Sequence, residues 1–189
     1  MKVQDFKWKK GITVKEMVGS FKHLGFQSIE SSRASEVIVK MKKNNAKVFL
    51  TFTSNMVTSG LRGFFAQIIK LGMADVIVTT VGGLEEDIMK GIGEKFEIGK
   101  FEADDVELHE QGVNRVGNLY INTEAYMNFE DYINPILHKL YLKKKRWTCS
   151  DLFKEIGLML EDEDSILYQA ARKDVPIFCP AITDGAFGF

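Results

Sequence analysis

The chain has 189 residues, of which 45% are hydrophobic and 27% are charged, and its formal net charge is −1. This length suits one domain with a sizeable core, and the near-neutral charge gives no electrostatic reason to expect a nucleic-acid or membrane partner. No apolar run approaches the roughly 20 residues of a membrane span. Cys149 and Cys179 match neither a disulfide framework nor a zinc-binding spacing, so we expect reduced thiols in a cytoplasmic protein without a metal site.

Two helices are predicted at the start of the chain. Residues 12–27 have apolar side chains at helical spacing, with Thr13 at the N-cap position. Residues 31–46 predict a second helix, which begins at Ser31 or Ser32 and ends at a pair of asparagines.

The middle of the chain alternates between strands and helices. Short apolar runs at 47–52 and 75–80 predict strands that are buried on both faces. Between them, residues 56–72 return to helical spacing and stop at Gly72. Residues 84–93 predict another helix with acidic residues in its first turn. This order of strand, helix and strand is typical of βαβ units.

The second half repeats this order more loosely. Residues 94–118 are the least regular, and we expect an ordered excursion from the sheet there. Residues 118–121 and the segment VPIFCPAITDG supply two further strand candidates. Helical patterns cover residues 127–142, 150–160 and 164–173. The sequence therefore predicts an α/β fold with a mainly parallel sheet.

The end of the chain suggests that this sheet is incomplete. The sequence stops at Phe189, shortly after an apolar strand and a turn. An α/β sheet would normally continue with another helix. A sheet that ended here would have few strands and an exposed edge.

Three polar, glycine-containing loops follow the predicted strands, at residues 53–60, 79–87 and 183–188. Ligands of open parallel sheets bind beyond the carboxyl ends of the strands, where these loops would gather. Glycines permit close approach of a ligand, and helix N-termini bind phosphates, so a dinucleotide is a sensible occupant. The usual G-x-G-x-x-G fingerprint is absent after both early strands. The residue pattern alone therefore does not decide the identity of the ligand.

The acidic residues of these loops have two interpretations each. Glu85, Glu86 and Asp87 could complement the dipole of the helix that they begin, or one of the two glutamates could hold a cation such as a polyamine ammonium group. Asp184 could belong to an ordinary Asp-Gly turn, or it could bind a ribose hydroxyl.

Four segments together resemble the N-terminal part of deoxyhypusine synthase. They are FTSNMVTSG, DVIVTTVGGLEED, NRVGNLYI and PAITDGAFG, and they occur in the family's order and at its intervals. The surrounding segments GFQS, FEDYINPIL and KRWTCSDL also resemble the family, so the similarity covers nearly the whole chain.

The resemblance implies a Rossmann-like, mainly parallel sheet with helices on both faces, of which residues 1–189 would be the N-terminal portion of a single NAD-binding domain. It implies NAD as cofactor and spermidine as substrate. Family members transfer the aminobutyl group of spermidine through an enzyme lysine to a lysine of the hypusine-containing translation factor, while NAD takes up and returns a hydride. A cytoplasmic, tetramer-type assembly is expected.

The resemblance also implies roles for individual residues. The residues that match the family's NAD contacts are Ser54, Asn55, Met56, Val57, Thr58, Thr80, Val81, Gly82 and Asp184. Those that match its acidic pair on the polyamine side are Glu85 and Glu86.

Two departures from the family bear on the activity. The nucleophilic lysine of the family follows a glycine-rich GGG segment that this sequence lacks, so we expect no catalytic nucleophile in this chain and a C-terminal partner chain or segment that supplies it. Phe189 stands where many members have an aspartate that helps to hold the polyamine, which leaves the amine donor and the acceptor open. The alternatives are a homospermidine-synthase-like enzyme and a non-catalytic regulatory paralogue; the intact loops favour an enzyme over the latter.

Overall fold

The computed structural model describes residues 2–188, which form two compact units, one up to Lys47 and one from Val48. Phe189, the residue at the usually acidic position, lies outside the described residues. None of the helices in the described part is long and apolar enough to cross a membrane.

The first unit consists of α1 (Val14–Ser20), a 3₁₀ turn η1 (Phe21–His23) and α2 (Gln27–Lys43). Thr13 caps α1 as predicted, because its side chain accepts from the N–H of Glu16 while the Glu16 carboxylate accepts from the N–H of Thr13. The second helix begins at Gln27, earlier than predicted. Ser31 lies inside it, and its hydroxyl donates to the carbonyl of Gln27 instead of capping.

A three-stranded parallel sheet forms the centre of the second unit, with β1 (Phe49–Phe52), β2 (Val76–Thr79) and β6 (Ile177–Phe178) in the order β1-β2-β6. In register, Thr51 pairs with Val78, and Val78 with Phe178. The predicted α/β class with a parallel sheet is confirmed.

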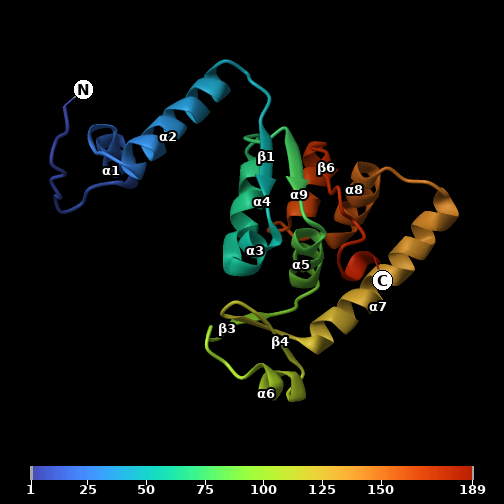
Figure 1. Ribbon diagram of the computed structural model, residues 1–189. Helices are drawn as coiled ribbons and strands as arrows, with labels where there is room; N and C mark the ends of the chain where they lie inside the picture. The colour runs from blue at the N-terminus through green and yellow to red at the C-terminus, as the bar shows by residue number, and fades with distance from the viewer. Residues whose placement is uncertain (1, 189) are drawn as a thin grey trace. The chain divides into compact units, whose positions relative to one another are not determined.

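Within residues 48–188 the sheet carries its helices on one face, whereas the prediction placed helices on both faces. The strand order advances in one direction from β1 to β6, and right-handed crossovers then place the connecting helices on the same face. Figure 1 shows α4 (Arg62–Lys70), α8 (Cys149–Leu160) and α9 (Ile166–Lys173) together on one side of the strands. On that side the ring of Phe52 stacks on Phe65 of α4.

Residues 48–188 leave the opposite face of the sheet uncovered at its outer strands, so the prediction that residues 47–52 form a strand buried on both faces is wrong. Phe49 of β1 is 65% exposed, and Phe178 of β6 is 46% exposed. Ile77, on the covered face of the central strand, is fully buried.

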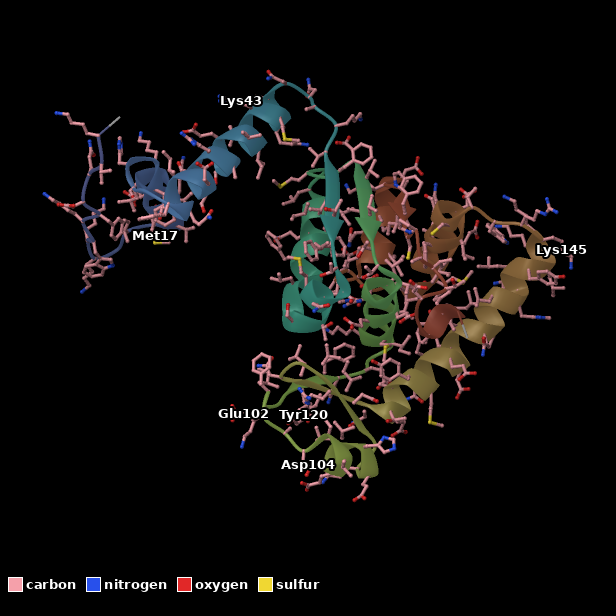
Figure 2. The ribbon with its side chains drawn as sticks, in the orientation of Figure 1. Met17, Lys43, Glu102, Asp104, Tyr120 and Lys145 are labelled. Atoms are coloured by element: carbon pink, nitrogen blue, oxygen red, sulfur yellow. The ribbon has the colours of Figure 1, made fainter. Side chains whose placement is uncertain are left out.

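Residues 94–118 leave the parallel sheet, as predicted. They contribute β3 (Phe96–Ile98), α6 (Asp105–Glu110) and β4 (Val113–Val116), and β5 (Leu119–Asn122) joins them in an antiparallel sheet of order β3-β5-β4. The strand predicted at 118–121 thus exists, but outside the parallel sheet. Gly99 lies directly against the ring of Tyr120, which Figure 2 labels.

The remaining elements frame the carboxyl edge of the parallel sheet. After β1 come the short α3 (Ser54–Met56) and a π-helical turn (Val57–Leu61), and after β2 comes α5 (Val81–Gly91). The long helix α7 (Thr123–Lys143) packs against α5, and a 3₁₀ turn, η3 (Ala186–Gly188), follows β6.

Candidate functional site

The loops after β1 and β2 meet at the carboxyl edge of the sheet, as the sequence predicts. The N–H of Ser54 donates to the hydroxyl of Thr80 over 3.0 Å. A Cβ at Gly82 would lie 3.2 Å from the Cβ of Ser54, and one at Gly83 would lie 3.1 Å from the hydroxyl of Thr79. The two glycines therefore let the start of α5 pack closely on the start of α3 and on the end of β2.

The third loop joins them through Glu85. The N–H of Phe187 donates to Oε1 of Glu85 over 2.8 Å. A Cβ at Gly185 would lie 2.5 Å from the same carboxylate oxygen. All three loops that the sequence singled out thus gather at one edge of the sheet.

The acidic residues lie deeper in the protein than predicted. Helix α5 begins at Val81, so Glu85, Glu86 and Asp87 occupy its second turn and not its first. All three are buried, with exposed fractions of 5%, 8% and 0%. The helix-dipole interpretation is therefore wrong, because that effect falls off within the first turn.

Glu86 binds the loop after β1. Its Oε2 accepts from the hydroxyl of the buried Thr58 over 2.6 Å. Burial raises the pKa of Glu86 to about 7, while the Thr58 hydroxyl and the ammonium of Lys90 oppose the rise and Glu85 adds to it. The carboxyl group therefore changes its charge near neutral pH.

Glu85 has no cationic partner among residues 2–188. Burial raises its pKa, and the N–H of Phe187 opposes this rise. Tyr126 of α7 lies near both glutamates: burial raises the pKa of its phenol first, and the charges of Glu86 and Glu85 raise it further. The acid pair is thus two buried carboxyl groups with raised pKa values, and the charge of Lys90 opposes the rise at Glu86.

Asp87 points elsewhere and has a structural role that sequence reasoning missed. Its carboxylate accepts from Nε of Arg62 over 2.6 Å and from the N–H groups of Ile166 and Leu167 at the start of α9. The hydroxyl of Ser165 also donates to it, over 2.9 Å. Burial raises the pKa of Asp87, and Arg62 opposes this. Tertiary packing alone distinguishes this acid from its two neighbours, and the sequence carries no signal of it.

The predicted NAD contacts differ in exposure. Asn55 and Asp184 are exposed, and Ser54 is half-buried. Val57 is fully buried and Val81 is 3% exposed, so their side chains belong to the core and only their backbones could contact a ligand. Met56 is 38% exposed, and Thr80 receives the N–H of Ser54.

No group of three or more His, Cys, Asp or Glu side chains within residues 2–188 could hold a metal ion. The polar groups at the edge of the sheet are hydroxyls, an amide, one exposed carboxylate and the N-terminus of α5. These groups suit the phosphates and sugars of a nucleotide, whereas the buried acid pair suits an organic cation.

Comparison with protein families matches residues 16–189 to the family described as deoxyhypusine synthase. A curated relative, the probable deoxyhypusine synthase of Thermoplasma volcanium, is 40% identical over 188 residues, which are 98% of this chain and 60% of the relative. The deoxyhypusine synthase of Neurospora crassa is 36% identical over 202 residues, which cover 97% of this chain and 57% of the relative.

A solved structure agrees with these matches. The crystal structure of an Entamoeba histolytica protein assigned to deoxyhypusine synthase has a TM-score of 0.70 and 28% sequence identity, and the match covers 98% of this chain and 64% of that one. The chain thus spans between 52% and 60% of the length of the first curated relatives that it matches.

Proposed function

This chain belongs to the deoxyhypusine synthase family, and we propose that it is the NAD- and amine-binding portion of a deoxyhypusine synthase. In this proposal the complete enzyme transfers the aminobutyl group of spermidine to a lysine of the hypusine-containing translation factor. Residues outside the present sequence supply the lysine nucleophile, because no lysine here follows a glycine-rich GGG segment. We also propose that the complete enzyme forms a tetramer-type assembly in the cytoplasm.

The observation that carries this proposal is that three glycine-containing loops meet at one edge of the sheet, next to a buried pair of acidic residues. The hydrogen bond from Ser54 to Thr80 and the contact of Glu85 with Phe187 bring the three loops within reach of one ligand. A site for a cofactor and a cation side by side is what an amine-oxidising transfer requires.

The residues at this edge fit NAD. In our proposal Ser54, Asn55, Thr80 and Asp184 offer hydrogen bonds, and the first turn of α5 at Gly82 offers N–H groups to the phosphates. The remaining predicted contacts would supply backbone groups and packing against the cofactor; they are Met56, Val57, Thr58 and Val81. NAD would supply a hydride acceptor that is regenerated within the reaction.

The acid pair fits a polyamine. Two adjacent buried carboxylates with raised pKa values are costly to ionise without a cation nearby. An ammonium group beside Glu85 and Glu86 would provide charge-assisted hydrogen bonds and would favour the ionised form of both. The residues of this chain would thereby orient the amine and exclude water from it.

A binding experiment tests the proposal. Isothermal titration of the protein in its native assembly with NAD, and then with spermidine, should show NAD binding in the wild type and weaker spermidine binding in Glu86→Gln with NAD binding retained. Unchanged spermidine affinity together with lost NAD affinity would contradict this division of roles.

A further inference from the structure

Lys90 is a half-buried cation on α5 that neither the sequence analysis nor the family resemblance singled out. Its Nζ donates to the carbonyl of Val57 over 2.8 Å and to that of Thr58 over 3.3 Å. The same ammonium lies 4.5 Å from the centre of the Phe96 ring, a cation–π contact. Three elements of the fold therefore meet at one charged group.

The carbonyls that Lys90 binds belong to an unusual piece of backbone. Residues Val57–Leu61 form a π-helical turn, and Gly60 departs from helical geometry with a φ of 104°. Such turns occur frequently at functional sites. Lys90 binds the first two carbonyls of this turn, at the end of the predicted cofactor segment.

Glu86 lies one helical turn before Lys90 and holds the same segment by its side chain. Thr58 donates its hydroxyl to Glu86, while its carbonyl accepts from Lys90. Glu86 and Lys90 thus both bind Thr58, one through its side chain and the other through its carbonyl. Their mutual attraction favours the ionised form of both.

We propose that Lys90 is a positioning residue, which fixes the predicted cofactor segment to the helix of the acid pair and keeps the carboxylate of Glu86 ready for an ammonium ion. The assignment of these two elements to cofactor and amine rests on the proposed function; the contacts of Lys90 do not. Burial lowers the pKa of Lys90, and the charge of Glu86 opposes this. The proposed role uses the ammonium form, which the two carbonyls and the face of the Phe96 ring stabilise.

The charged and titratable groups that face Glu86 come from several elements. Lys90 and Glu85 share its helix, and Tyr126 approaches from α7. Arg62 and Asp87 act on Lys90 itself, in opposite directions. Of these groups, Lys90 is the one whose charge lowers the pKa of Glu86.

Titration of Glu86 by NMR tests this role on the full chain, with ¹³C-labelled glutamate carboxyl groups and the Glu86→Gln variant for assignment. In Lys90→Met, we expect the titration of Glu86 to shift to higher pH and the amides of residues 57–61 to exchange faster. Lys90→Arg should stay near the wild type, and so should the control Lys139→Met, which changes an exposed lysine of α7.

An unshifted titration of Glu86 in a folded Lys90→Met protein would overturn the proposal. If that variant does not fold, Lys90→Gln carries the same test, because its amide can still donate to the carbonyls while the charge is gone. A wild-type assembly that binds neither NAD nor spermidine would instead refute the proposed function, and the titration result for Lys90 would stand apart from it.

Discussion

Thr58 and Glu86 are 28 positions apart in the chain, yet their side chains form a buried hydrogen bond of 2.6 Å. Thr58 ends the segment predicted to bind NAD, and Glu86 belongs to the pair predicted to bind the amine. This contact gives the two predicted halves of the site a direct physical connection. Burial raises the pKa of Glu86 and this contact opposes the rise, so the protonation of Glu86 can be followed by titration of the folded protein.

The first prediction concerns the stability of Glu86→Gln as a function of pH. Burial raises the pKa of Glu86 from 4.5 to about 7, so the folded state holds its proton more tightly than the unfolded state. The contribution of this group is therefore fully present below pH 4.5 and is lost as pH rises through about 7. Relative to the wild type, the variant should gain up to about 3 kcal/mol between acid and mildly alkaline pH.

Urea denaturation of both proteins at several pH values measures this difference. Glu97→Gln, a change at an exposed residue of β3, serves as the control for the removal of a surface carboxylate. A constant difference between wild type and Glu86→Gln would mean that Glu86 titrates as an ordinary exposed acid.

The second prediction separates Asp87 from its neighbours. Asp87→Asn breaks a buried ion pair with Arg62 and weakens the capping of α9, so it should destabilise the fold by about 3–5 kcal/mol. Asp105→Asn removes a pair with Arg115 in which the carboxylate is exposed, and its stability should stay close to that of the wild type. Equal effects of the two changes in thermal or chemical denaturation would refute the structural role of Asp87.

The third prediction tests the packing of α8 on α9. A Cβ at Gly157 would collide with the backbone carbonyl of Leu167, so Gly157→Ala should destabilise the protein by about 1–3 kcal/mol through overpacking. Gly19→Ala is a matched control in α1, where a Cβ meets no atom within 4 Å, and it should be neutral or slightly stabilising. A stable Gly157→Ala protein would mean that the two helices lie farther apart.

The fourth prediction concerns the cofactor edge. Asn55→Ala and Asp184→Ala should each weaken NAD binding by about 1–3 kcal/mol, if each side chain bonds the cofactor. Equilibrium titration of NAD against the native assembly measures the loss, with Asp131→Ala on the exposed side of α7 as control. Unchanged affinity in both variants would remove these residues from the cofactor site.

Much of the fold can be predicted from the sequence, because its signals are local. The strands at β1 and β2 are short apolar runs bounded by polar turns, and Thr13 at the N-cap position marks the start of α1. The meeting of the loops follows from the rule that parallel strands end at one edge. These parts of the prediction required no knowledge of tertiary contacts.

The start of α5 and the separate roles of its acids could not be predicted in this way. Gly82 and Gly83 disfavour a helix by propensity, yet close packing on Ser54 and Thr79 holds them in its first turn. Successive residues of a helix point about 100° apart, so Glu86 reaches Thr58 while Asp87 reaches α9. Three adjacent carboxylates look alike in the sequence, and only their surroundings distinguish them.

Native mass spectrometry of the protein purified from its own cells tests the central claim most directly. We predict an assembly that retains NAD and contains, in a second chain or a further segment, a lysine that follows a glycine-rich motif. An oligomer composed only of the present sequence, without NAD, would contradict the claim that this chain is the cofactor- and amine-binding portion of a deoxyhypusine synthase.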